Sequence, residues 1–455
     1  MFKHRGNPLL LKALILGILA ISLLIPLEMI EGLIAERASR RIEAVHSVQA
    51  SFAGAQTVVL PFFVWPYTEH WTETATDANG RVIRTTQMSE AKNLLWFAGQ
   101  LQSDVQVTVQ NDRYRGIHRV RTFDSKMNIS GTFLWPDRDA VKPSAEGRRI
   151  EWGEPRLVLP ISDVRGLRGT PALTIGGDQR AFREATQLHL LPAGIHSTLS
   201  PAPANSSSRF AIELGVAGTE HLAFAPTAAS SVVTMKSPWP DPHFGGRYLP
   251  VDRTVSAEGF TARWEVSALA SAVQQQLRSI TSTPRSDRER GAAIDTFEVG
   301  FIEAVNTYLL AERSAKHGAL IIAMVFAALF LFDTLRGLDA HPIQYGFVGL
   351  ALVIFFLLLL SLSEHIAFGI AYLIAAIACT VLITYYLQYV LGDFRRACSF
   401  GAALTLVYAA TYAILVSEGT ALLMGSLLLF ALLAAAMVVT RKFDWRKVPH
   451  VTAPG

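Results

Sequence analysis

Cysteine and charged residues are both scarce in this chain. Its 455 residues include only two cysteines, Cys379 and Cys398, and neither falls in the long polar middle. Two cysteines so placed cannot form a disulfide framework, nor complete a tetrahedral zinc site without other ligands. Charged residues make up 17% and hydrophobic residues 51%, against about 25% charged in an average soluble protein. This composition excludes a disordered chain and argues against a purely soluble protein.

The usual catalytic motifs are also missing. The sequence contains no P-loop, no dinucleotide-binding glycine motif, no HExxH, no GxSxG and no EF-hand loop. Its twelve histidines are scattered, and no carboxylate completes a metal set around His189 and His196. The net charge of +4 is small, and no nucleic-acid-binding motif accompanies it. We therefore expect no cofactor, no metal, no nucleic acid and no enzymatic activity.

Long apolar runs are the main positive feature. The first covers residues 9–27, and five more follow the polar middle, at residues 319–335, 343–362, 366–391, 399–416 and 421–440. Each approaches the roughly 20 residues that an α-helix needs to cross a bilayer. We expect six membrane-spanning helices. The first is interpreted as an uncleaved signal anchor because it is long and lacks a small-residue cleavage site.

Basic residues in the short loops predict the orientation. The two ends of the chain are basic, and Arg336, Arg395 and Arg396 follow the second and fourth runs. The alternate loops, residues 363–365 and 417–419, contain no lysine or arginine. The positive-inside rule then places both termini in the cytoplasm and the long polar region outside it.

The polar middle carries strand signals. Residues 105–109 and 212–216 alternate apolar and polar side chains, and turn residues separate such runs. This pattern predicts an antiparallel sheet or sandwich with one wet face. The expected fold class is an α-helical multi-pass membrane protein with a large β-rich extracytoplasmic domain inserted after the first helix. Whether this domain divides into two lobes is left open.

The expected boundaries follow from these signals. They are residues 1–8 for a cytoplasmic N-terminus, 9–35 for the first span and a stalk, 36–316 for the extracytoplasmic domain, 317–440 for a five-helix bundle and 441–455 for a cytoplasmic tail.

Ionisable residues near the membrane are the first candidate site residues, because such groups are costly in hydrocarbon and often functional. Asp333 lies three residues before Arg336, where an ion pair at the interface is the simplest account. His341 begins the third apolar run. Glu364 and His365 form the tight outer turn, where they could relay a proton, grip a headgroup or simply cap helices.

Several segments resemble the CreD family of inner-membrane proteins, also called cell envelope integrity or colicin-tolerance proteins. They include AERSAKHGA at 311–319, HPIQYGFVGL at 341–350, SPWPDP at 237–242, and the stretches 248–256, 259–264, 360–365 and 441–445. The resemblance is ordered along most of the chain and looser between about residues 68 and 150. It implies a Gram-negative inner-membrane protein with a periplasmic domain, linked to colicin tolerance and envelope integrity. It supplies no biochemical activity.

Four functions remain open, and the last of them is a sensor. The favoured one is a non-catalytic envelope protein that acts by binding. Arg253, Arg263 and Trp264, in the resembling segments of the domain, are further candidate residues without an assigned role. A transporter or lipid-handling protein is the first alternative, with Glu364, His365 and Asp333 lining a route. The second is an envelope-modifying enzyme, which needs a convergent pocket formed by Arg247, Asp252, Arg253, Arg263 and Glu265.

The expected partners are the lipid bilayer and an envelope protein or lipid. The oligomeric state is left open. A sensor would need a separate output partner, because the expected cytoplasmic loops are short.

Overall fold

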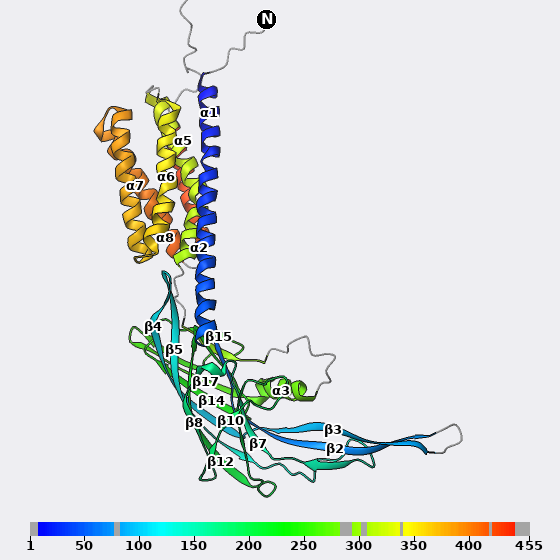
Figure 1. The fold of residues 1–455 in the computed structure, drawn as a ribbon. Coiled ribbons are helices and arrows are strands. Elements are labelled where there is room, and N and C mark those ends of the chain that lie inside the picture. The colour runs from blue at the N-terminus through cyan, green and yellow to red at the C-terminus, as the bar shows by residue number, and fades with distance from the viewer. Residues whose placement is uncertain are drawn as a thin grey trace, which may run out of the picture. The chain divides into compact units, whose positions relative to one another are not determined.

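The computed structural model describes residues 8–76, 82–282, 294–301, 307–336, 340–417 and 421–441 (Figure 1). The chain divides into two compact units. One combines residues 1–41 with residues 305–455, and the other comprises residues 42–304. We call them the helical unit and the β-rich unit.

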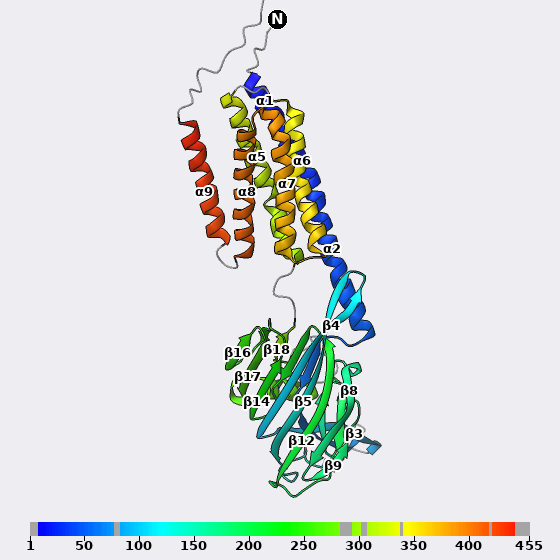
Figure 2. The ribbon, with the colours of Figure 1, turned by 90° about the vertical axis from the view of Figure 1, so that its left-hand side faces the viewer.

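The helical unit contains the apolar runs. Figure 2 shows its helices, of which α6, α7 and α8 run side by side. The helices are α1 (Pro8–Ser22), α2 (Leu24–Ser51, which continues into the β-rich unit), α4 (Thr307–Lys316), α5 (Gly318–Arg336), α6 (Pro342–Ser363), α7 (Phe368–Leu391), α8 (Phe394–Val416) and α9 (Ala421–Thr440).

Five helical segments of the described chain are long and apolar enough to cross a membrane. They are Leu11–Ser51, Thr307–Thr334, Pro342–Ser363, Phe368–Leu391 and Phe394–Val416. This confirms the expectation of several spans, one near the N-terminus and four in the C-terminal part. The last expected run forms α9, which is not among the five.

Local chemistry explains where these helices begin and end. His341 caps α6, since its Nδ1 accepts a hydrogen bond from the Ile343 N–H and Gln344 completes a capping box. Gly392 ends α7 at φ 62°, a left-handed conformation that glycine adopts without strain. Asp393 then caps α8 by accepting a hydrogen bond from the Arg395 N–H at 2.9 Å.

The β-rich unit has three sheets. The four-stranded sheet runs β1 (Gln56–Val59), β13 (His221–Ala225), β18 (Phe297–Gly300), β15 (His243–Gly246). The second runs β10 (Arg183–Glu184), β11 (Gly194–Thr198), β7 (Arg156–Pro160), β2 (Phe62–Thr76), β3 (Val82–Trp96), with β6 (Arg149–Trp152) also paired to β2. The eight-stranded sheet runs β16 (Asp252–Ser256), β17 (Gly259–Ser267), β14 (Ser230–Ser237), β4 (Gln100–Arg115), β5 (His118–Leu134), β12 (Ser207–Thr219), β8 (Leu167–Ile175), β9 (Asp178–Ala181). Helix α3 (Val273–Ser282) and two short 3-10 turns, Val164–Gly166 and Ala268–Ala270, complete this unit.

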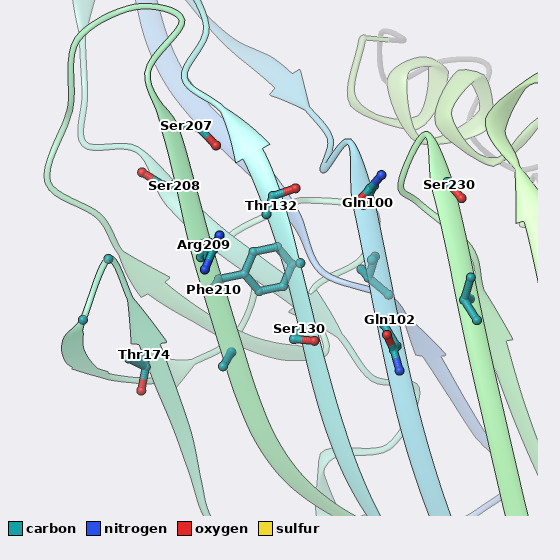
Figure 3. Close-up of a pocket in the computed structure, with 16 residues that line it drawn as sticks. Gln100, Gln102, Ser130, Thr132, Thr174, Ser207, Ser208, Arg209, Phe210 and Ser230 are labelled. Atoms are coloured by element: carbon teal, nitrogen blue, oxygen red, sulfur yellow. The ribbon is translucent and has the colours of Figure 1, made fainter.

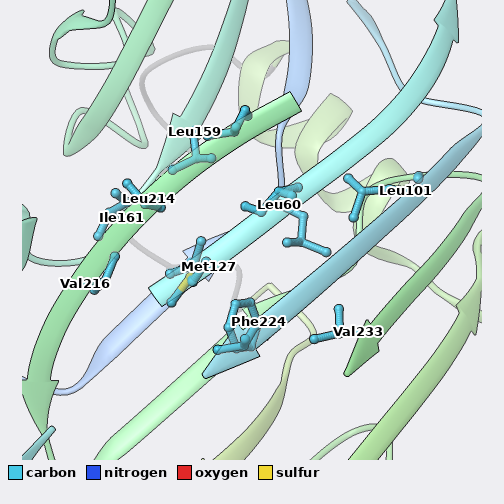
Figure 4. Packing of buried hydrophobic residues seen from close by; sticks show 14 of the residues in the cluster. Leu60, Leu101, Met127, Leu159, Ile161, Leu214, Val216, Phe224 and Val233 are labelled. Atoms are coloured by element: carbon cyan, nitrogen blue, oxygen red, sulfur yellow. The ribbon is translucent and has the colours of Figure 1, made fainter. Parts of the chain in front are cut away.

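The alternation in the sequence explains the eight-stranded sheet. In β4, Leu101, Val105 and Val107 are buried while Gln102 and Gln106 are exposed, as the two-residue period of a strand requires. The buried side chains meet those of the other sheets in one hydrophobic core, part of which Figure 4 shows around Met127 and Phe224. The expected β-rich domain is therefore confirmed.

Most strand pairs are antiparallel, as expected, but two of the described pairs are parallel. Strand β1 pairs with β13 in parallel, and β14 pairs with β4 in parallel. Parallel neighbours need long crossover connections, so strands far apart in the chain meet in these sheets.

Candidate functional site

The turn between α6 and α7 holds two candidate residues, Glu364 and His365, whose side chains have different surroundings. Glu364 is only 10% exposed; it accepts a hydrogen bond from the Tyr308 hydroxyl at 3.3 Å and faces Arg37 Nε at 3.7 Å. The next side chain, His365, is exposed. Glu364 therefore joins the turn to α2 and α4, and the structure does not bring His365 into this cluster.

Asp333 joins three helices at the other end of the helical unit. It is 5% exposed, forms an ion pair with Lys12 Nζ at 2.6 Å, and accepts a hydrogen bond from the Tyr345 hydroxyl at 2.9 Å. The side chain of Arg336, its expected partner, lies outside the described residues. The cluster ties α1, α5 and α6 together, and nearby His341 serves as the helix cap.

Trp264 and Arg263 point to opposite faces of β17. Trp264 is 1% exposed, stacks on Phe297 with ring centroids 5.0 Å apart, and donates its indole N–H to the Tyr248 carbonyl. Arg263 lies on the outer face and pairs with Glu265. Trp264 is thus a core residue.

The five polar residues of the enzyme alternative do not meet in one pocket. Arg263, Glu265 and Asp252 share the outer face of the sheet, with Arg263 and Asp252 3.8 Å apart. Arg253 follows Asp252 on the strand and so points the other way, lying over the Phe244 ring. Arg247 pairs with Asp295 at 3.6 Å. This arrangement argues against the convergent pocket that catalysis would need.

A broad polar hollow lies on the outer face of the eight-stranded sheet, with a volume of about 900 Å³. Figure 3 shows its side chains, which come from β4, β5, β8, β12 and β14. Eight of its sixteen described lining residues carry a hydroxyl or carboxamide group, and Arg209 is the only charged residue among the sixteen. The polar lining residues are Gln100, Gln102, Ser130, Thr132, Thr174, Ser207, Ser208, Arg209 and Ser230.

This hollow, which we call the sheet hollow, can donate and accept hydrogen bonds in many directions. Hydroxyl and carboxamide groups each do both, so they suit an uncharged ligand rich in similar groups. None of its residues was a candidate from the sequence. The available signal was the alternation of Gln100 and Gln102 with buried residues, but which strands lie beside β4 is not visible in the sequence.

A buried carboxylate was also missed. Glu69 on β2 is 1% exposed and accepts hydrogen bonds from the backbone N–H and hydroxyl of Ser144, from Lys92 at 3.1 Å and from Arg148 at 3.2 Å. Burial alone would raise the pKa of Glu69, but these hydrogen bonds outweigh it and lower the pKa to about 2. Glu69 is therefore an ionised structural anchor at neutral pH.

Metal ligands do not cluster in the part of the chain that the structure describes. No group of three or more histidine, cysteine, aspartate or glutamate side chains there is arranged to hold a metal ion. The absence of a cofactor stays a prediction.

Comparisons with known proteins point to one family. A sequence model described as "Inner membrane protein CreD" matches residues 8–446. The chain is 31% identical over 425 residues to Inner membrane protein CreD of Escherichia coli (strain K12), covering 93% of this chain and 90% of that protein.

Two solved structures show weak likenesses to parts of this chain. A protein of Legionella pneumophila described as a candidate nutrient binding protein has a TM-score of 0.29 at 4% identity, covering 60% of this chain and 79% of that one. An M1 zinc metallopeptidase of Deinococcus radiodurans has a TM-score of 0.20 at 10% identity, covering 45% and 42%. Both TM-scores are too low to carry an argument.

Proposed function

The chain belongs to the family of the inner membrane protein CreD, and from this premise we propose that it supports cell-envelope integrity by binding. In this proposal the β-rich unit holds an envelope component in the sheet hollow, and the protein itself catalyses no reaction. The location in the inner membrane follows from membership in this family. The binding role is argued from the sheet hollow alone.

The lining of the sheet hollow favours one chemical class of ligand. Its hydroxyl and carboxamide groups match a ligand that carries hydroxyl and amide groups of its own, such as a glycan chain of the cell wall. Arg209 adds a single positive charge, which suits a ligand with few anionic groups. Binding sites are usually concave and place a few polar groups among apolar residues, and the lining of the sheet hollow contains both kinds.

The proposed topology places this surface outside the cytoplasm. Six crossings, with α9 as the sixth, would leave both termini in the cytoplasm and the β-rich unit in the periplasm. The arginines at 336, 395 and 396 and the basic tail support this orientation through the positive-inside rule. Both termini of the β-rich unit would then connect to the same membrane.

A matched pair of variants tests the binding role in vitro. Ser130→Arg would project a long cationic side chain into the sheet hollow, whereas Asn128→Arg adds the same side chain to the same exposed face of β5 outside the lining. Purified full-length protein in detergent is titrated with soluble glycan strands from cell wall. We expect at least about tenfold weaker binding for Ser130→Arg and little change for Asn128→Arg. Equal binding by both variants contradicts the proposal.

A lipid-handling role is the second candidate, supported by a groove of about 480 Å³ between α7 and α8. Its lining is apolar, with three tyrosines, Tyr372, Tyr408 and Tyr412, and it lies on helices apolar enough to cross a membrane. Ala376→Trp would fill the groove, and Ile374→Trp lies on α7 outside its lining. This role predicts that only Ala376→Trp lowers photo-crosslinking to lipids in proteoliposomes. Equal lipid crosslinking by the two variants would contradict the lipid-handling role.

A further inference from the structure

The turn that joins β4 to β5 carries three arginines and exposed apolar surface. We call residues 113–119 the β4–β5 tip. It reads Arg-Tyr-Arg-Gly-Ile-His-Arg and contains no acidic residue. Tyr114 is 49% exposed and Ile117 is 48% exposed. Gly116 adopts φ +59°, which allows the tight turn.

The β4–β5 tip lies against the end of α2. The guanidinium of Arg113 stacks 4.0 Å from the centre of the Phe52 ring. Two residues later, Arg115 donates hydrogen bonds to the hydroxyls of Ser47 at 3.2 Å and Ser51 at 3.0 Å. From Arg113 to Arg115 the strand therefore runs back along the helix, from Phe52 toward Ser47. Figures 1 and 2 both show the tip beside this end of α2.

A second set of contacts fixes this end of α2 to the β-rich unit. Arg165 donates hydrogen bonds to the carbonyls of Gln49 at 3.1 Å and Ala50 at 2.6 Å, which are among the last of the helix. Asp163 holds Arg165 in turn, at 2.6 Å, and the hydrogen bonds from Arg165 lower the pKa of Asp163. The direction of the tip relative to the helix is thus set by several charge-assisted contacts.

Helix α2 connects the β-rich unit to a candidate membrane span. It is continuous from Leu24 to Ser51 and belongs to the first candidate membrane span. From Arg113 to Arg115 the tip runs toward the N-terminal, apolar part of this helix, where the helix would cross the bilayer surface.

We propose that the β4–β5 tip binds the phosphate groups of anionic phospholipids at that surface. Guanidinium groups pair well with phosphate oxygens, and Arg119 is already oriented by its hydrogen bond to the Tyr114 hydroxyl at 3.0 Å. Tyrosine favours the headgroup level of a bilayer, and an exposed isoleucine gains by burial there. The lipid contact would set the β-rich unit at a defined angle on the membrane. This proposal does not depend on the ligand of the sheet hollow.

The scarcity of cysteine makes a direct test possible. In full-length protein with Cys379→Ala and Cys398→Ser, a single Ile117→Cys is labelled with an environment-sensitive fluorophore. Leu134→Cys, at the opposite end of β5, is the matched control position. The protein is placed in nanodiscs that contain headgroup spin-labelled lipid, with either anionic phosphatidylglycerol or only zwitterionic phosphatidylcholine.

We expect strong quenching of the label at 117 in anionic nanodiscs, little in zwitterionic nanodiscs, and none at 134. Arg119→Gln removes one positive charge and should weaken the anionic lipid contact about fivefold, since each basic residue near an anionic surface contributes about 1 kcal/mol. Circular dichroism checks that this variant keeps its sheets. Equal quenching at 117 and 134, or quenching at 117 that is independent of lipid charge, overturns the proposal.

Discussion

At the scale of single residues, the β-rich unit is stabilised by an ionised carboxylate that is almost fully covered. Glu69 gathers the backbone and hydroxyl of Ser144 and the cations of Lys92 and Arg148, and so connects β2, β3 and the segment before β6. A buried charge is tolerated only when such partners satisfy it. Its pKa of about 2 lies below its usual value of 4.5.

The lowered pKa of Glu69 predicts a specific loss of stability in acid. A group whose pKa is lower in the folded state stabilises the fold above its usual pKa, and this contribution disappears as the pH falls from about 5 toward 2. Glu69→Gln should cost about 1.5–3 kcal/mol of unfolding free energy at pH 7 and should lose less stability than the parent protein over that pH range. Urea unfolding of full-length protein in detergent, followed by tryptophan fluorescence, measures both effects.

Glu90→Gln is the control, because Glu90 contacts the same Lys92 and Arg148 but is 51% exposed. Its variant should unfold within about 0.5 kcal/mol of the parent protein. If the stability of both glutamine variants depends on pH in the same way, ionised Glu69 does not contribute the predicted stability.

At the scale of helices, Glu364 connects the α6–α7 turn to helices α2 and α4. Its contacts with Arg37 and Tyr308 hold the α6–α7 turn to α2 and α4. His365 makes no comparable contribution to this cluster, since its side chain is exposed. The two neighbours should therefore differ in their effect.

Complementation of a deletion strain under envelope stress separates the two residues. Glu364→Gln should reduce rescue because it removes the charge that faces Arg37, whereas His365→Ala should rescue like the parent protein at matched membrane abundance. If instead only His365→Ala abolishes rescue, the turn acts through the exposed histidine. That result would support a transporter or a proton relay at this turn.

Elements whose signal is local could be predicted from the sequence. The apolar runs form helices because hydropathy alone specifies them, and the strand of residues 105–109 lies in β4 because alternation is a property of neighbours. The same alternation implies that Arg263 and Trp264 point to opposite faces. The sequence does not show which strands pair, so the parallel contact of β14 with β4 and the sheet hollow beside it were not foreseen.

Asp333 illustrates the same limit inside the helical unit. The sequence offered Arg336 as a partner because three residues separate them on one helix. In the structure its carboxylate reaches Lys12, near the other end of the chain, and Tyr345 on the next long helix. Such contacts depend on helix packing and leave no mark in the local sequence.

At the scale of the whole molecule, the proposed topology makes a prediction about three positions. Alkaline phosphatase, which is active only in the periplasm, should be active when fused at Ala204 and inactive when fused after Gly392. A fusion in the C-terminal tail distinguishes six crossings from five, since six predict an inactive enzyme there. If the fusion after Gly392 has alkaline phosphatase activity and the fusion at Ala204 has none, the orientation in the membrane is the opposite of the proposed one.

If the protein acts by binding, the sheet hollow is required for envelope integrity. The most direct test of this claim is rescue of a deletion strain under envelope stress by Ser130→Arg and by Asn128→Arg, compared at equal membrane abundance. We predict that Ser130→Arg loses most of the rescue and that Asn128→Arg retains it, because only position 130 belongs to the lining of the hollow. Full rescue by Ser130→Arg would contradict a binding role of the sheet hollow and would direct the search for the functional site to the helical unit.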